Sequence, residues 1–346
     1  MDVAGRHVRV LVANPGSSSL KLSLLDSDDT LLWARELDAP RAAVEKPDVA
    51  EALADLPAPP DVVGHRVVHG GERFREAVVL DAGVQAALRE LAVLAPLHQP
   101  KSLATIEALE GALPQVKAVA CFDTAFHATL PAAAATYALP RAWRTRYGIR
   151  RYGFHGLSHA YAARAAGDAR RVVTCHLGAG ASLCAVLDGR SVDTTMGFTP
   201  LEGLVMATRS GSVDPGLLLW LEQNEGVSVD EMAQALEHES GLLGLAGTAD
   251  MRELLERQDE EARLALEVYV HRLRAGIAAM ATALGGLDAL VFTGGVGENS
   301  ARIRELACDG LSHLGVGPPD DRVRVLCVRA REDLEIARQA RELLRV

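Results

Sequence analysis

The chain has 346 residues, of which 49% are hydrophobic and 24% are charged, and its formal net charge is -10 at pH 7. One hydrophobic core rarely organises a chain of this length, so we expect two domains in an ordinary globular protein. The excess of acidic residues disfavours a nucleic-acid partner, because phosphate backbones are bound by clustered Lys and Arg.

The first predicted strand covers residues 8–13 and leads through Asn14-Pro15-Gly16 into a second strand over residues 20–25. A turn rich in Gly and Ser presents N–H groups and hydroxyls to a phosphate without bulky side chains, although surface hairpins use the same residues. The stretch 171–178 aligns without a gap over residues 9–16. We therefore predict an internal duplication, with a phosphate-contacting turn in each half.

Two polar side chains in the first half are associated with predicted strands. Arg66 lies in His65-Arg66-Val67-Val68-His69-Gly70-Gly71, where a strand-borne guanidinium followed by a glycine pair suits an anion. The alternative is an ion pair with a surface acid. Asp123 follows the apolar stretch 116–121, at the strand end where α/β proteins collect ligand groups.

The second half contains three further glycine-rich segments. Residues 152–159 place two histidines between glycines, without the ligand spacing of a zinc site. Residues 208–216 combine Arg209 with turn residues, which an exposed loop would explain equally well. Residues 290–299 follow an apolar strand and have the composition of a phosphate or nucleoside loop. Helical periodicity appears over 84–94, 101–109, 262–284 and 301–306, so the class is α/β, with a boundary near residue 150 and a nucleotide gripped between two lobes.

The five cysteines are widely spaced and include no CxxC pair, so we expect reduced thiols in the core. The N-terminal segment lacks the apolar region of a signal peptide, and no stretch is apolar over the roughly 18 residues that a membrane span needs. We therefore expect a cytoplasmic protein without a membrane partner.

Nine motifs in order resemble the acetate kinase family and its propionate and butyrate kinase relatives, over nearly the whole chain. They are NPGSSSLK, GHRVVHGGE, APLHQP, FDTAFHATLP, YGFHGLSH, HLGAGAS, DTTMGFTPLEGL, TRSGSVDPG and VFTGGVGENS. The resemblance implies the acetate and sugar kinase/Hsp70/actin (ribonuclease H-like) superfold, with two duplicated lobes and a central cleft. It also implies a homodimer, transfer of a phosphoryl group from ATP to acetate, and a place in acetyl-CoA biosynthesis. The expected lobes are 1–149 with 333–346, and 150–332 with the nucleotide site and the dimer contacts.

The resemblance also assigns roles to individual residues. Magnesium or manganese would be held by Asn14 and Glu332. The catalytic residues would be Asp123, His155 and Arg209. The substrate would be bound by Arg66, which holds the carboxylate, and by His98, with Val68, Leu97, Phe154 and Pro200 around the methyl group. ATP would be bound by Lys21, His176, Leu177, Gly178, Ala179, Gly180, Asp250, Met251, Arg252, Gly295, Val296, Gly297, Glu298 and Asn299.

These residue types fit the chemistry, because a carboxylate and a phosphoryl group are both anions that cations must bring together. Arg66 can hold the carboxylate in a planar, bidentate manner, and Arg209 with His155 can neutralise the transferring group. A carboxylic acid has already lost its proton at pH 7, so Asp123 is expected either to move a proton or to position a cation.

The sequence leaves two alternatives to acetate kinase activity. A propionate or butyrate kinase would need only a larger methyl pocket. A nucleotide-binding regulatory protein of the same fold is the other alternative, because Ala179 replaces the Asn that the HLGNG motif of the family carries beside the phosphates.

Overall fold

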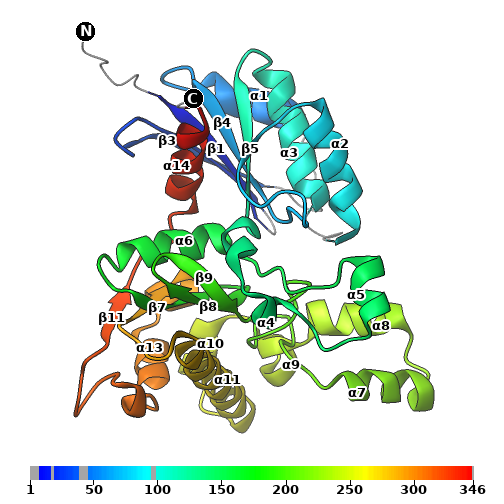
Figure 1. The fold of residues 1–346 in the computed structure, drawn as a ribbon, viewed down its shortest axis with the longest axis vertical. Helices are drawn as coiled ribbons and strands as arrows, with labels where there is room; N and C mark the ends of the chain where they lie inside the picture. Colours follow the sequence, from blue (N-terminus) through cyan, green and yellow to red (C-terminus); the bar gives the residue numbers. More distant parts are fainter. Residues whose placement is uncertain (1–7, 17–18, 39–45, 95–98, 345–346) are drawn as a thin grey trace. The chain divides into compact units, whose positions relative to one another are not determined.

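The computed structural model describes residues 8–16, 19–38, 46–94 and 99–344. These form two compact units, Met1–Ala128 with Arg331–Val346, and Thr129–Ala330 (Figure 1). No helix in the described ranges combines the length and the apolar character that crossing a membrane requires.

The first unit contains a mixed sheet in the order β3-β2-β1-β4-β6-β5. Its strands are β1 (Val10–Pro15), β2 (Ser19–Leu25), β3 (Leu31–Asp38), β4 (Val62–Val67), β5 (Val78–Val79) and β6 (Lys117–Phe122). Its helices are α1 (Lys46–Ala54), α2 (Ala82–Glu90), η2 (Leu91–Leu94), α3 (Gln99–Ala112) and α14 (Glu332–Leu344). The predicted hairpin is confirmed, because β1 pairs antiparallel with β2, while β1, β4 and β6 are parallel neighbours.

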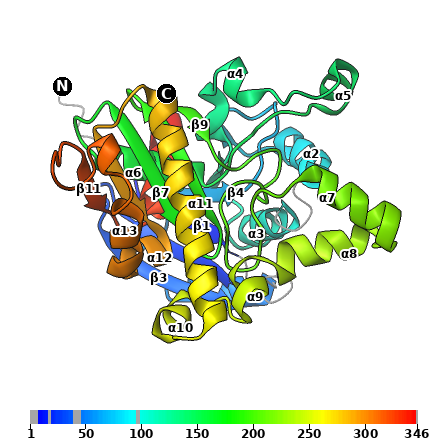
Figure 2. The same ribbon diagram turned by 90° about the horizontal axis from the view of Figure 1, so that it is seen from below.

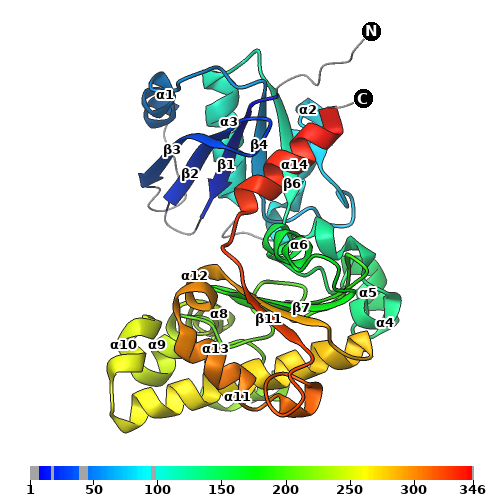
Figure 3. The same cartoon turned by 90° about the vertical axis from the view of Figure 1, so that its left-hand side faces the viewer.

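Side chains alternate between the two faces of this sheet, and each face is covered by different helices. Leu11 and Ala13 pack in a core with residues of α1 and α3. On the other face, α14 contacts β1, β4 and β6 (Figure 3). The absence of a side chain at Gly64 allows α14 to pack closely against β4, since a Cβ at this position would lie 2.5 Å from Cγ2 of Ile336. Arg66 lies two residues after Gly64 and therefore shares the face that α14 covers.

The second unit repeats much of this topology in the order β11-β10-β7-β8-β9. Its strands are β7 (Arg171–Leu177), β8 (Ala181–Leu187), β9 (Arg190–Thr194), β10 (Ala289–Thr293) and β11 (Arg324–Cys327). Its helices are α4 (Ala132–Ala135), α5 (Arg141–Tyr147), α6 (Gly156–Ala165), α7 (Pro215–Trp220), η4 (Leu221–Glu225), α8 (Val229–Gln234), η5 (Ala235–Glu239), α9 (Gly241–Ala246), α10 (Met251–Glu256), α11 (Glu260–Leu284), α12 (Gly294–Asn299), α13 (Ala301–Cys308) and η6 (Ser312–Leu314). The 3-10 helix η3 (Ala125–Thr129) spans the division between the units.

The second sheet is also covered on both faces. The long helix α11 begins after the N-cap Asp259, whose side chain accepts from the amide of Ala262, and ends at Gly285 in the left-handed conformation. It crosses β7 and β8 (Figure 2). Gly276 of this helix allows the close approach to β8, since a Cβ at this position would lie 2.7 Å from Cδ1 of Leu183. Helix α6 contacts β7 and β10. Ser182 faces away from α11, because it alternates with Leu183 along β8.

The division between the units lies at Ala128/Thr129 and not near residue 150. Residues 129–149 join the second unit through side-chain and backbone contacts. Thr129 Oγ1 donates to the carbonyl of Ser191 at 2.8 Å, the amide of Arg151 donates to Ala135 O at 2.8 Å, and Tyr137 is hydrogen bonded to Glu202. At the other end, Glu332 belongs to the first unit and not to the second, because it begins the helix that covers the first sheet.

All five cysteines are free thiols, as predicted, but their location is only partly as predicted. Cys121, Cys175 and Cys184 are buried, whereas Cys308 is half-buried and Cys327 is exposed. The expectation of a core location is therefore wrong for Cys327. Strand β11 lies at the edge of its sheet and is largely exposed, which explains the difference.

Candidate active site

Four polar side chains of the first unit meet at one edge of its sheet. Asn14 ends β1, Arg66 lies near the end of β4, and Asp123 follows β6. These strands are parallel neighbours, so their carboxyl ends lie together. Glu332, the first residue of α14, joins them from the helix that covers this face.

The guanidinium of Arg66 connects this cluster. Its Nε lies 3.1 Å from each carboxylate oxygen of Asp123, and its Nη2 donates to Asp123 Oδ2 at 2.7 Å. Its Nη1 donates to Asn14 Oδ1 at 3.1 Å and lies 3.6 Å from Glu332 Oε2. Asn14 Nδ2 in turn donates to Glu332 Oε2 at 2.8 Å. The predicted alternative of a surface ion pair is wrong, because the side chains of Arg66 and Asp123 are only 14% and 2% exposed.

Burial and ion pairing act against each other in this cluster. Burial disfavours the charge on Arg66, but Asp123 and Glu332 overcome it and raise the pKa of the guanidinium. Burial also raises the pKa of Asp123, while the guanidinium of Arg66 opposes that shift. Arg66 is therefore a permanent cation, held in a fixed orientation by a buried carboxylate.

The remaining predicted residues of the first unit lie at different depths. Lys21 is exposed and lies opposite Asn14 in the β1–β2 ladder. Val68 is buried. Leu97 and His98 lie outside the described residues.

Asn14 and Glu332 are suitable ligands for a magnesium ion. They supply an amide oxygen and a carboxylate, which are the hard donors that this ion prefers. Within the described ranges no group of three or more His, Cys, Asp or Glu side chains is placed to hold a metal. Magnesium usually keeps several waters and adds phosphate oxygens to one or two protein ligands, so a two-residue site fits it.

A cavity of about 770 Å³ in the second unit collects most of the predicted nucleotide-binding residues. Gly178 and Ala179 reach it from the β7–β8 turn, while Asp250, Met251 and Arg252 come from the start of α10. The third segment, α12, contributes Gly295, Val296 and Asn299. The other residues of its lining were not assigned to ATP from the sequence, and they are Ala207, Thr208, Leu242, Ala249, Leu255, Tyr269 and Ser300.

Local structure explains how these segments present themselves to the cavity. Asp250 caps α10 by accepting from the amide of Arg252 at 2.8 Å, and its side chain also pairs with the Arg252 guanidinium. These hydrogen bonds lower the pKa of Asp250 to about 2. At Gly295 a Cβ would meet nothing within 4 Å, so this backbone is open to a ligand.

Several residues predicted to contact ATP do not line this cavity. They are Lys21, His176, Leu177, Gly180, Gly297 and Glu298. Glu298 has a structural role, because its Oε1 accepts from the amide of Gly294 at 3.0 Å and from that of Ala330 at 2.7 Å. Leu177 and Gly297 are buried and pack against each other, since a Cβ on Gly297 would lie 3.6 Å from Cβ of Leu177.

His155 and Arg209 approach the same glycine of the β7–β8 turn. A Cβ on Gly180 would lie 3.3 Å from Nε2 of His155 and 3.4 Å from Nη1 of Arg209. The ring of His155 stacks on that of His176, with centroids 4.4 Å apart. Arg209 Nη1 donates to Pro200 O at 3.3 Å, and burial lowers the pKa of Arg209. Imidazole and guanidinium groups therefore converge on a backbone without side chains, a suitable place for an anion.

The predicted methyl-pocket residues of the second unit have different exposures. Phe154 is buried, immediately before His155, whose φ of 56° turns the chain into α6. Pro200 is half-buried.

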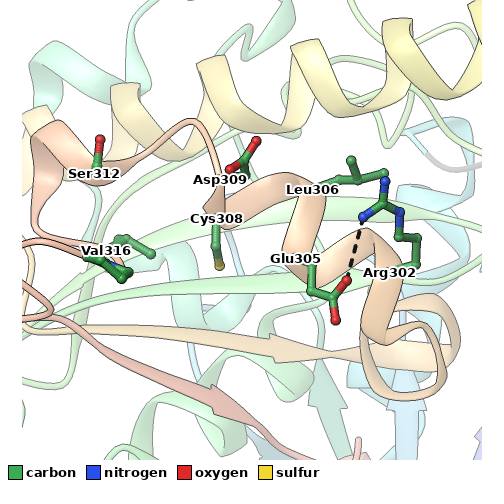
Figure 4. A pocket seen from close by; sticks show the side chains of 9 residues that line it. Arg302, Glu305, Leu306, Cys308, Asp309, Ser312 and Val316 are labelled. Carbon is green, nitrogen blue, oxygen red and sulfur yellow. Dashed lines mark ion pairs between the residues drawn. The ribbon is translucent and has the colours of Figure 1, made fainter.

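A second hollow, of about 430 Å³, lies along α13 and the loop after it (Figure 4). Arg302 and Glu305 form an ion pair of 3.7 Å at its rim, and Cys308 and Val316 line it. It contains none of the predicted site residues.

Comparison with known proteins agrees with the resemblance found in the sequence. The model of the acetokinase family matches residues 41–339. The acetate kinase of Gloeobacter violaceus is 45% identical over 405 aligned residues, which cover 98% of this chain and 100% of that protein. The acetate kinase of Deinococcus deserti is 47% identical over 389 residues, covering 96% and 97%.

Two solved structures are similar over their whole length. The acetate kinase of Porphyromonas gingivalis has a TM-score of 0.88 at 35% identity and covers 98% of this chain and 100% of its own. A propionate kinase of Francisella tularensis has a TM-score of 0.88 at 35% identity, covering 97% and 99%. The ROK hexokinase of Thermus thermophilus shares the fold alone, with a TM-score of 0.50 at 15% identity over 97% of this chain and 99% of its own. The predicted α/β superfold of duplicated lobes is confirmed.

Proposed function

Because the chain belongs to the acetokinase family, whose members transfer phosphate to a carboxylate, we propose that it is a magnesium-dependent acetate kinase. A carboxylate oxygen of acetate attacks the γ-phosphorus of ATP in line, and the bond from that phosphorus to the ADP oxygen breaks. The products are acetyl phosphate and ADP, and the reverse reaction makes ATP. Arg66 is the observation that carries this proposal, because a buried guanidinium of fixed orientation is what recognition of a small carboxylate requires.

We propose that Asp123 positions Arg66 and does not act as a base. The contact between Asp123 Oδ2 and Arg66 Nη2, at 2.7 Å, supports this assignment, as does the ionised state of acetate at neutral pH. Nη1 of Arg66 donates to Asn14 Oδ1 at 3.1 Å and to Pro15 O at 3.5 Å, so a bound carboxylate would replace the longer of these two contacts.

Asp123→Asn tests the two roles of Asp123. If it is a positioning group, turnover falls, KM for acetate rises, and the magnesium dependence is unchanged. Normal turnover with unchanged magnesium dependence would exclude both a proton-moving and a positioning role.

In the second unit, we assign His155 and Arg209 to the transferring phosphoryl group. Their approach to Gly180 supports this assignment, because equatorial phosphoryl oxygens accumulate charge that cations and N–H donors stabilise. The residues that line the cavity of about 770 Å³ would hold the nucleoside and its phosphates. His176, Leu177, Gly297 and Glu298 would pack behind that site, and Gly180 would lie beside the transferring phosphoryl group. Lys21 remains a proposed phosphate contact of the first unit.

Asn14 and Glu332 would hold magnesium or manganese together with water and phosphate oxygens. The bound ion would neutralise charge on the β- and γ-phosphates. Asn14 and Glu332 are hydrogen bonded to each other and face the cationic Arg66.

The choice of carboxylate is tested by trapping acyl phosphates with hydroxylamine in parallel reactions with acetate, propionate and butyrate. We expect the highest kcat/KM with acetate. A propionate kinase is the second candidate, because the Francisella tularensis propionate kinase matches this chain as well as the acetate kinase of Porphyromonas gingivalis does. Higher kcat/KM with propionate or butyrate would contradict the acetate assignment, and ATP binding without any acyl phosphate would favour the regulatory alternative.

We further propose a cytoplasmic homodimer that supplies acetyl phosphate toward acetyl-CoA. Large apolar side chains on α5 and α7 support an interface in the second unit, since Trp143, Tyr147 and Trp220 are 55%, 55% and 49% exposed. Charge also favours association of two copies, because α5 carries Arg141, Arg144 and Arg146, whereas the segment 214–240 contains acidic residues and no Lys or Arg. Sedimentation of Trp220→Glu beside the wild type tests this interface, and an unchanged dimer would contradict it.

A further inference from the structure

Helix α6 brings histidines and hydroxyl groups together beneath the proposed phosphoryl site. His155 and His159 are one helical turn apart at its start; both contact Ser182 of β8, and His159 also contacts Thr174 of β7. Ser182 lies directly opposite His176 in the β7–β8 ladder, and Thr174 lies opposite Cys184. His159, Thr174 and Ser182 are fully buried, so their polar atoms depend on each other for hydrogen bonds.

The buried groups form a continuous chain of hydrogen bonds. Ser182 Oγ lies 2.9 Å from Nδ1 of His155 and 2.7 Å from Nε2 of His159. The other ring nitrogen of His159, Nδ1, lies 2.7 Å from Thr174 Oγ1. Thr174 Oγ1 then donates to the carbonyl oxygen of Cys184 at 3.5 Å.

The carbonyl at the end of this chain determines its direction, because a carbonyl can only accept. Thr174 uses its single proton on Cys184 O and therefore accepts from His159 Nδ1–H. Neutral His159 then has a lone pair on Nε2, which accepts the proton of Ser182. Ser182 has no second proton and must accept from His155 Nδ1–H.

We propose that Ser182, whose own proton is directed to His159, is a positioning residue that keeps a proton of His155 on Nδ1 and so directs Nε2, where protonation adds the second N–H, toward Gly180. This inference rests on the proposed function of His155 in the second unit. Ser182 itself touches the histidine and not the reacting groups.

The orientation of the His155 ring matters because it sets which groups Nε2 faces. The same atom of His155 lies beside Gly180, close to Nη1 of Arg209. Because Nδ1–H is a donor in both neutral and protonated imidazole, His155 can gain or lose a proton at Nε2 without rearranging the chain. Stacking on His176, at 29° between the ring planes, further restricts rotation of the ring.

The test compares Ser182→Ala, Ser182→Thr and the wild type in the full-length protein. Nitrogen-15 NMR of the histidine rings reports which nitrogen of His155 carries the proton, independently of catalysis. We expect Nδ1–H in the wild type, a mixture of tautomers in Ser182→Ala, and Nδ1–H again in Ser182→Thr, which keeps the hydroxyl. We also expect kcat to fall about 10- to 100-fold in Ser182→Ala with a changed pH profile, KM for ATP changing by less than about twofold.

Ser191→Ala is the matched control. Ser191 is as fully buried as Ser182 and lies on the neighbouring strand β9, but its hydroxyl oxygen accepts from Cys184 Sγ at 3.2 Å. It should leave the tautomer of His155 and the pH profile unchanged, and the same change in both alanine variants would overturn the proposal.

Two other results would also overturn it. One is Ser182→Ala that retains only the Nδ1–H tautomer of His155, and the other is a loss of activity without any change in tautomer or pH profile. A changed tautomer with normal kcat would support the positioning by Ser182 and contradict the catalytic part that the proposed function gives His155.

Discussion

The two sheets have corresponding strands but bring different chemistry to the same position. In the first, β2, β1, β4 and β6 follow one another as β8, β7, β10 and β11 do in the second, with matching parallel and antiparallel pairings. β1 ends at Pro15 and β2 begins at Ser19, while β7 ends at Leu177 and β8 begins at Ala181. The copies have therefore kept their backbone arrangement, including the length of the connecting turn.

The side chains at the strand ends differ in charge. The first sheet gathers Arg66, Asp123 and Glu332 into an ion network. The second places Gly178 and Ala179 of its β7–β8 turn beside a cavity, and its histidines hydrogen bond to hydroxyls. Under the proposed function, the duplicated fold assigns carboxylate recognition to one copy and nucleoside binding to the other.

The largest effect should come from breaking the ion network of the first sheet. Arg66→Leu should lower kcat/KM for acetate about 10³-fold, on the order of 4 kcal/mol, because it leaves Asp123 buried without its cation and removes the anion contact. Steady-state kinetics with varied acetate measure this loss. Arg89→Leu, which removes an exposed ion pair with Glu107 in the same unit, should change kcat/KM less than about twofold. A loss below about tenfold in Arg66→Leu would contradict the central role of the guanidinium.

The buried histidines of the first unit should make it acid-sensitive. Burial lowers the pKa of His65 to about 3 and that of His69 to about 4. In the unfolded chain both rings take up a proton below the ordinary histidine pKa of 6.5, whereas in the folded state they stay neutral. Stability is therefore retained above pH 6.5 and lost as pH falls toward 4, by about 2 kcal/mol for each ring at pH 5. Urea unfolding across this range measures the loss. His65→Leu should reduce the pH dependence by about half, and an unchanged slope would contradict the assignment.

The close approach of α14 to the first sheet should be sensitive to one methyl group. Gly64→Ala places Cβ within 2.5 Å of Ile336 Cγ2 and should cost about 2 kcal/mol of unfolding free energy. Gly111→Ala is the control, because its Cβ meets nothing within 4 Å, and it should be neutral or slightly stabilising. Denaturant unfolding compares the two variants, and equal stabilities would show that α14 tolerates displacement.

The smallest change in kinetic constants should come from filling the cavity of the second unit. Ala249→Phe should raise KM for ATP about tenfold while KM for acetate changes little, because Ala249 lines the cavity of about 770 Å³. Leu264→Phe alters an exposed side chain that does not line this cavity and should leave both constants unchanged. A rise in KM for acetate instead would contradict the division of tasks between the two sheets.

Much of this arrangement could be predicted from the sequence, because strand ends and glycine turns are local signals. The gapless repeat predicted the matching β1–β2 and β7–β8 hairpins, and the position of Asp123 after a strand predicted its place at the sheet edge. The chain through Ser182 could not be predicted, since it depends on strand register and on the packing of α6. The division at Ala128 also escaped prediction, because it is set by tertiary contacts of residues 129–149.

Helix α14 has a consequence for biosynthesis. Residues 129–330 form one uninterrupted stretch, so the whole second unit is translated before residues 332–344, which form α14. The first sheet, although translated earlier, must wait for α14 to cover the apolar face around Val10 and Gly64. The first unit can therefore be completed only after the second has been synthesised, and until then its exposed apolar face is the part of the nascent chain that chaperones would protect.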